Sequence, residues 1–139
     1  MPPSTWHRFP RSKPICRKLL LQRPDLEHLW FSGGDPLTLS MDRLETLISL
    51  THRYLPKASI SMYGRVDSTF RKTVADLKHL KELGVDDIVI GIESGYDLAL
   101  KAMNKGYTAA DLLRECRKFE EAGQIDDLSC HLSGRHCRA

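Results

Sequence analysis

Residues 88–92 read Ile-Val-Ile-Gly-Ile, an apolar run that is almost entirely β-branched. Such a run is typical of a parallel strand that is covered on both faces of its sheet. Two similar segments precede it, at 28–32 and 60–63. The three segments start about thirty residues apart, which is near the length of a strand–helix–strand unit. The spacing therefore predicts three parallel strands.

Helical patterns fill the gaps between these strands. Over 41–55, apolar residues recur every three or four positions, with Ser40 as the candidate N-cap and Pro56 as the stop. The segments 73–84 and 108–123 share the pattern Thr-x-Ala-Asp-Leu and a closing Gly, which predicts a capping box at the start and a left-handed Gly at the end. The third helix is expected to pack through Leu112, Leu113, Cys116 and Phe119.

Strands that alternate with helices predict an α/β fold with right-handed crossover connections. We expect three regions: a basic, poorly ordered arm over 1–24, the folded unit over 25–123, and an irregular tail over 124–139. The tail is polar and turn-prone where a fourth strand is due. A short helix within 11–23 is a further expectation. No apolar run approaches the ~18 residues that cross a bilayer, so no membrane partner is predicted.

The charge pattern argues against a nucleic-acid partner. The 139-residue chain has 21 basic and 18 acidic residues, and six of the basic residues but none of the acidic ones lie within 1–24. A nucleic-acid footprint needs basic residues clustered on a folded face. No secretion signal is visible, and the prolines of the arm would break the helix of a transit peptide. These features predict a cytoplasmic protein with four reduced cysteines: Cys16, Cys116, Cys130 and Cys137.

The turn after the first strand reads Ser32-Gly33-Gly34-Asp35-Pro36. It lies at the carboxyl end of a strand, where α/β folds gather their ligands. Gly33 and Gly34 would let the backbone approach a ligand closely, Asp35 can accept from an ammonium group, and Pro36 stiffens the turn. The alternative is an ordinary tight turn in which Asp35 caps the next helix.

The turns after the other two strands also carry polar side chains. After the second strand, Arg65 can hold a carboxylate and Tyr63 can line a pocket, or Arg65 forms a surface ion pair with Asp67. After the third strand, Glu93 can accept from hydroxyl or amine donors, or it pairs with a neighbouring Lys. Both alternatives stay open at each turn.

In order and spacing, these stretches resemble the radical S-adenosylmethionine (SAM) superfamily. Residues 31–37 resemble its GGEP-type turn, which binds the amino group of SAM. Residues 63–84 and 90–106 are similar to successive units of the branch related to coproporphyrinogen dehydrogenase. In that branch the Glu that matches Glu93 contacts the ribose or amino-acid part of the cofactor. The resemblance covers roughly 28–123.

The resemblance implies a partial (β/α) barrel, about three βα units of a six-unit core. It implies SAM as the small-molecule partner and a [4Fe–4S] cluster whose electron cleaves SAM to a 5′-deoxyadenosyl radical. The residues implied to hold SAM are Gly33, Gly34, Asp35, Pro36, Tyr63, Arg65 and Glu93.

The chain departs from the family at the cluster. The family holds it with three cysteines in a C-x3-C-x2-C loop, whereas Cys16 is the one cysteine before residue 28. We therefore expect a fragment that is not catalytically competent, with no catalytic or metal-ligating residues, or alternatively a non-catalytic SAM-binding or scaffold module. A zinc site from Cys130-His131 and His136-Cys137 is conceivable, although an unstructured tail is favoured. The substrate and the oligomeric state stay open.

Overall fold

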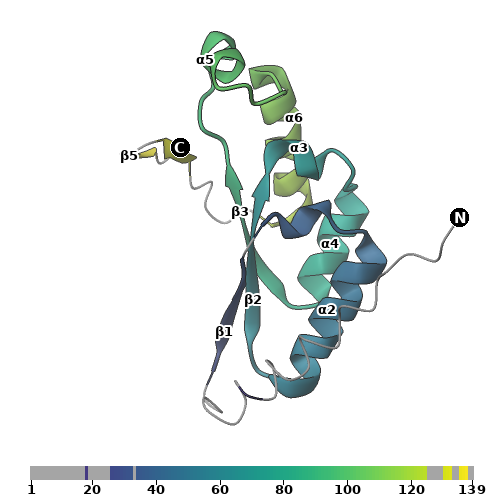
Figure 1. The fold of residues 1–139 in the computed structure, drawn as a ribbon. Helices are drawn as coiled ribbons and strands as arrows, with labels where there is room; N and C mark the ends of the chain where they lie inside the picture. The colour runs from purple at the N-terminus through teal and green to yellow at the C-terminus, as the bar shows by residue number, and fades with distance from the viewer. Residues whose placement is uncertain (1–17, 19–25, 33, 125–129, 133–134, 138–139) are drawn as a thin grey trace, which may run out of the picture.

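The structure is a computed structural model that describes residues 18, 26–32, 34–124, 130–132 and 135–137. Figure 1 shows the three central strands and the helices beside them. The elements in chain order are β1 (His28–Phe31), η2 (Pro36–Thr38), α2 (Met41–Tyr54), β2 (Ser59–Arg65), α3 (Val66–Thr69), α4 (Val74–Glu82), β3 (Val85–Gly91), α5 (Asp97–Ala102), α6 (Ala109–Ala122), β4 (Cys130–Leu132) and β5 (Arg135–Cys137).

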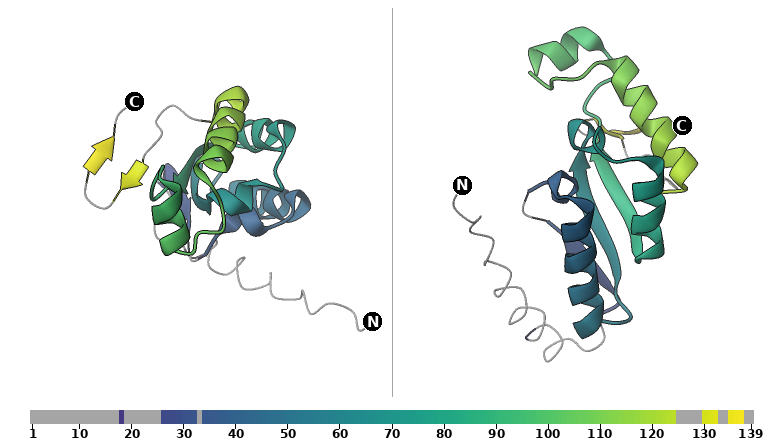
Figure 2. Two further views of the ribbon diagram at one scale, coloured as in Figure 1. Left: turned by 90° about the horizontal axis from the view of Figure 1, so that it is seen from above. Right: turned by 90° about the vertical axis from the view of Figure 1, so that its right-hand side faces the viewer.

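The three predicted strands form one parallel sheet in the order β1-β2-β3. Phe31 pairs with Met62, and Arg65 pairs with Gly91, so the carboxyl ends of the strands meet at one edge. The helices α2, α4 and α6 lie on one face of this sheet, as the side view in Figure 2 shows. The expected α/β fold is confirmed, but among the described residues helices cover one face of β3 rather than both.

Two apolar clusters hold the helices against the sheet. The larger one combines alternate residues of β2 and β3 with α2 and α4, and it includes Leu44, Ile60, Met62, Leu77 and Leu80. The smaller one gathers around the end of β3 and includes Val66, Ile92, Leu100, Tyr107 and Leu112. Ile90 packs against both clusters, so the end of β3 joins the two parts of the core.

Local signals set most helix ends as expected. Thr73 and Asp76 form a capping box on α4, and Thr108 and Asp111 form one on α6. Gly123 ends α6 in the left-handed conformation with a φ of +67°. Ser40 is the N-cap of α2 as expected, although its side chain makes no capping hydrogen bond. One expectation was wrong: Leu113 is 59% exposed, because it lies off the buried stripe of α6.

The C-terminal tail differs from what the sequence predicts. Within the tail expected to be irregular, β4 and β5 form an antiparallel hairpin in which Cys130 opposes Cys137 and His131 opposes His136. Strands of three residues are too short to show a recognisable alternation of apolar and polar residues, so the sequence did not predict them. The arm over 1–24, including its expected helix, lies outside the described residues except for Lys18.

Candidate functional site

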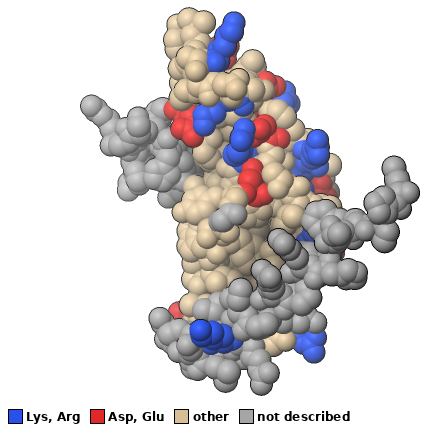
Figure 3. All heavy atoms as spheres, in the orientation of Figure 1, with Lys and Arg blue, Asp and Glu red and all other residues tan. Residues whose placement is uncertain are grey.

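The three turns predicted to carry chemistry lie at the carboxyl edge of the sheet. The register of β1, β2 and β3 brings Asp35, Arg65 and Glu93 to this edge from turns some thirty residues apart in the chain. Figure 3 shows that Lys, Arg, Asp and Glu side chains gather on this face of the molecule towards the ends of β2 and β3, whereas its middle carries few. The charged part of the surface therefore coincides with the candidate site.

Asp35 ties the first turn to the second. Its Oδ1 accepts a hydrogen bond from the Leu37 amide at 3.1 Å and so caps η2, while its Oδ2 accepts from the Arg65 amide at 3.2 Å. Leu37 is fully buried beneath it, and a Cβ on Gly64 would lie 2.5 Å from Leu37 Cδ1. The absence of a side chain at Gly64 thus lets η2 pack directly on β2.

The glycines before Asp35 behave as the sequence suggests where they are described. Gly34 has a φ of +139°, a conformation that residues with a Cβ rarely adopt, and a Cβ there would meet no atom within 4 Å. Its backbone is therefore open to a ligand. Pro36 occupies the first turn of η2. Gly33 lies outside the described residues, so its role stays a prediction.

Arg65 and Tyr63 lie on the open face at the end of β2. The Arg65 guanidinium donates to both carboxylate oxygens of Asp67, at 2.9 and 2.8 Å, so the surface ion pair considered for this turn is present. Tyr63 stacks on Trp30 of β1 with ring centroids 4.8 Å apart. Tyr63 is 46% exposed, and the stacked pair forms a flat apolar surface on the side of the sheet away from α2 and α4.

Glu93 occupies an unusual backbone position after β3. Its φ is +66°, which costs a residue with a Cβ about 1–3 kcal/mol. Its Oε1 accepts from Lys105 Nζ at 2.9 Å, so the alternative of a Lys partner is also present. Both side chains are partly exposed, which leaves the carboxylate accessible to a further donor.

Tyr107 holds the Glu93 turn from beneath. Its hydroxyl donates to the carbonyl oxygen of Ile92 at 3.1 Å. Burial raises the pKa of Tyr107, and the negative charges of Glu93 and Asp67 raise it further. The second and third turns therefore influence the same buried hydroxyl.

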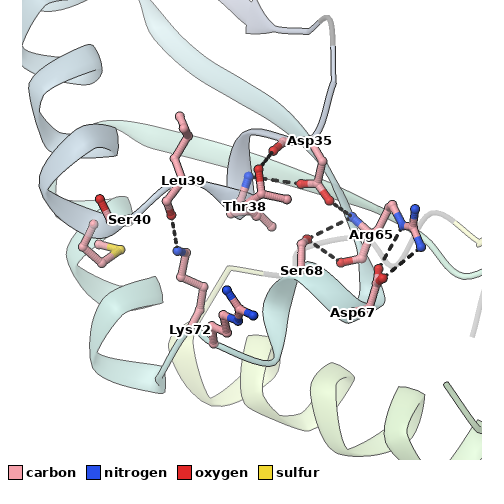
Figure 4. Close-up of a pocket in the computed structure, with 11 residues that line it drawn as sticks. Asp35, Thr38, Leu39, Ser40, Arg65, Asp67, Ser68 and Lys72 are labelled. Atoms are coloured by element: carbon pink, nitrogen blue, oxygen red, sulfur yellow. Dashed lines mark hydrogen bonds and ion pairs between the residues drawn. The ribbon is translucent and has the colours of Figure 1, made fainter. Parts of the chain in front are cut away.

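Two cavities flank Asp35. One of about 660 Å³ extends from Asp35 and Arg65 to the start of α2, and Figure 4 shows Asp35 and Arg65 on one side of it and Ser40 and Lys72 on the other. The other, of about 490 Å³, lies between Trp30, Gly34 and Leu47 and also includes Asp35 and Pro36 in its lining. Asp35 is thus the carboxylate that both cavities share.

The sequence did not single out Lys72, Lys105 or Tyr107 as site residues. Lys105 and Tyr107 lie 12 and 15 positions from their partners Glu93 and Ile92, and Lys72 lies 33 positions from Leu39, whose carbonyl it binds. No periodic pattern connects residues at such separations. The stretch 103–106 did carry part of the family resemblance, and this was the available signal for Lys105.

Among the side chains that the structure describes, which do not include those of residues 130–137, no three from His, Cys, Asp and Glu gather in a group able to hold a metal ion. The zinc site considered for Cys130, His131, His136 and Cys137 therefore stays untested. Cys116 lies on α6 and packs against the smaller apolar cluster. Cys16 lies outside the described residues. The described side chains therefore do not fit an iron–sulfur cluster, and no helix among them is both long and apolar enough to pass through a bilayer.

Comparisons with known proteins agree on one family. The sequence profile of the radical SAM superfamily matches residues 13–133. The chain is 26% identical over 102 residues to the heme chaperone HemW of Bacillus subtilis (strain 168), and this match covers 73% of the chain and 27% of HemW. The chain therefore spans about a quarter of the length of that relative.

One solved structure has a similar fold. It is the cobalamin-dependent SAM radical enzyme OxsB, solved with aqua-cobalamin and SAM bound. The TM-score is 0.55 at 19% sequence identity, and the match covers 78% of this chain and 17% of OxsB. This likeness supports the α/β partial-barrel architecture of the described strands and helices.

Proposed function

The chain belongs to the radical SAM superfamily, and from this premise we propose that the carboxyl edge of its sheet, where the turns after β1, β2 and β3 meet, forms part of a binding site for SAM. The observation that carries the proposal is the hydrogen bond from the Arg65 amide to Asp35, which fixes the carboxylate of the first turn at the edge where all three turns meet. We further propose that the chain is one piece of a larger barrel and is not catalytically competent by itself.

Asp35 has the chemistry to receive the ammonium group of SAM. Each oxygen of a carboxylate accepts more than one hydrogen bond, and each oxygen of Asp35 takes a single backbone amide among the described residues. These two bonds orient the carboxylate before a ligand arrives. The open backbone at Gly34 gives the ligand a close approach.

The other turns would contact the remainder of the cofactor. Glu93 is partly exposed and has acceptor capacity for a ribose hydroxyl or an amine in addition to its bond from Lys105. The Trp30–Tyr63 pair offers an apolar wall on the same face of the sheet, and Arg65 adds a cation that a carboxylate can share with Asp67. The chain's contribution is to bind and orient.

The radical chemistry of the family requires an iron–sulfur cluster, which the described residues do not fit. A single upstream cysteine, Cys16, cannot replace three thiolates. We therefore assign no chemical step to the chain. The second candidate function is a non-catalytic SAM-binding or scaffold module, and the charge and cysteine pattern favours a cytoplasmic setting for either function.

Titration of the purified chain with SAM by calorimetry tests the binding proposal. We expect saturable binding that weakens by roughly tenfold or more in Asp35→Asn, because a hydrogen bond to a charged group contributes about 1.5–3 kcal/mol. The amide oxygen of Asn can accept only one of the two backbone amides that Asp35 holds, so a thermal melt must first show that the variant is folded. The matched control is Asp86→Asn, an exposed residue at the opposite end of β3.

The outcomes of this titration are distinct. Saturable binding that Asp35→Asn weakens and Asp86→Asn leaves unchanged supports the proposed site. No saturable binding at millimolar SAM would leave a fragment without a retained cofactor site. Equal affinity in both variants would show that SAM binds without Asp35 and would overturn the proposed site.

Anaerobic reconstitution with iron and sulfide tests catalytic incompetence. We expect far fewer than four irons per chain, because four-iron clusters need three or four thiolate ligands. A brown protein that holds about four irons per chain and gives the absorption of a [4Fe–4S] cluster would contradict the proposal.

A further inference from the structure

Lys72 is a buried cation with spare hydrogen-bonding capacity. It is 6% exposed and follows the short helix α3, and its ammonium group donates to the Leu39 carbonyl oxygen at 2.5 Å. This is its one hydrogen bond among the described residues, although an ammonium group has three donors and no acceptor. Burial lowers the pKa of Lys72 because a desolvated charge is disfavoured, whereas the carboxylates of Asp76 and Asp35 raise it.

Lys72 lines the cavity of about 660 Å³ beside Asp35, and other hydrogen-bond donors line that cavity too. Figure 4 shows Lys72 directed at the segment 39–40, which leads directly into α2. Ser40 is the N-cap of α2, but its side chain makes no capping bond, so no described side chain accepts from the amides of Met41 and Asp42 at the start of this 14-residue helix. The positive end of a helix dipole therefore points to the place where Lys72 lies.

Arg71 adds a second cation to the lining of the cavity. It is exposed, and no carboxylate among the described residues pairs with it. The two carboxylates of the lining are otherwise engaged: Asp67 pairs with Arg65, and Asp35 accepts two backbone amides. Three cations thus face two carboxylates, and the unpaired positive charge lies at the Lys72 side.

We propose that this cavity is a binding site for the phosphate group of a small ligand, held by Lys72, Arg71, Ser40 and the first amides of α2. Two segments far apart in the chain, 40–41 and 71–72, present donors to the same cavity, and two cations suit a phosphate dianion better than a singly charged carboxylate. The site does not depend on SAM binding. Its donors approach from the helix-covered side of the Asp35 turn, whereas Trp30 and Tyr63 lie on the open face.

Titration with inorganic phosphate at constant ionic strength tests the proposal, with the amide resonances of Ser40, Met41 and Asp42 followed by NMR. We expect saturable shifts with a millimolar dissociation constant. Arg71→Gln should weaken binding by about tenfold, the effect of one charge-assisted hydrogen bond. The matched control is Arg53→Gln, which removes the same charge from the last turn of α2 and should leave the affinity unchanged.

Two further measurements complete the test. Lys72→Met should weaken phosphate binding at least as much as Arg71→Gln does, and Arg71→Gln keeps the proposal testable if Lys72→Met fails to fold. Acetate should bind at least tenfold more weakly than phosphate. The proposal is overturned if phosphate produces no saturable shift, if acetate binds equally well, or if Arg53→Gln weakens binding as much as Arg71→Gln does.

Discussion

The turn after β1 and the turn after β3 present a carboxylate at the same edge of the sheet by different means. Asp35 is held by two backbone amides, one from its own turn and one from β2. Glu93 is held by a Lys side chain and lies at a left-handed backbone position. The first carboxylate is therefore fixed by the main chain, whereas the second depends on an exchangeable, partly exposed ion pair.

The two turns also belong to different parts of the core. Leu37 anchors the Asp35 turn in the larger apolar cluster, against β2 and α2. Ile92 and Tyr107 anchor the Glu93 turn in the smaller cluster, with α5 and α6. A larger and more completely buried cluster resists local opening more strongly. We expect the Asp35 turn to be the more rigid of the two.

The largest effect should come from Leu37→Ala. Leu37 is 1% exposed, and truncation of a buried Leu costs about 2–5 kcal/mol of unfolding free energy. The measurement is urea unfolding monitored by circular dichroism. The control is Leu98→Ala on α5, near the Glu93 turn, which is 64% exposed and should change stability by less than about 0.5 kcal/mol. Similar losses for both variants would show that the first turn is not anchored as described.

Tyr107→Phe tests the support beneath Glu93 and should have a smaller effect. Loss of the hydrogen bond to Ile92 should cost about 0.5–1.5 kcal/mol at neutral pH. Folding raises the pKa of Tyr107 above its ordinary value of 10.0. The stabilisation of the fold by the protonated hydroxyl is therefore complete below the unfolded-state pKa and is lost as pH rises through the folded-state pKa. The stability difference between wild type and variant should therefore narrow above pH ~10.

Urea unfolding at neutral and alkaline pH measures this difference. Tyr96→Phe is the control, because Tyr96 is exposed and no hydrogen bond from its hydroxyl is present among the described residues. A stability difference that stays constant or widens above pH ~10 would argue against the role assigned to the Tyr107 hydroxyl.

The smallest effect, of opposite sign, should come from Glu93→Gly. A Gly relieves the left-handed strain, while loss of a partly exposed ion pair costs about 0–1 kcal/mol. We expect a net gain of up to about 1 kcal/mol in unfolding free energy, together with weaker SAM binding. Lys105→Gln removes the same ion pair without changing the backbone. If Glu93→Gly proves less stable than Lys105→Gln in urea, the backbone at Glu93 is not strained.

Much of the fold was readable from local patterns. The three strands, the helices at 41–55 and 73–84 and both capping boxes follow from periodicities and short-range bonds that the chain carries within a few residues. The short helices α3 and α5 were missed because four and six residues give too little periodicity. Leu113 was misassigned because the buried stripe of α6 runs through Leu112, Glu115, Phe119 and Ala122, and Leu113 lies outside it.

The sequence by itself determined that strands alternate with helices, that Asp35, Arg65 and Glu93 follow strand ends, and which family the turns resemble. Those properties depend on residue types close together in the chain. Only the tertiary structure decided that Asp35 binds the amide of Arg65, that Glu93 pairs with Lys105, and that Lys72 is buried against Leu39. Such contacts join residues far apart in the chain, and they depend on strand register and helix packing, which no local pattern specifies.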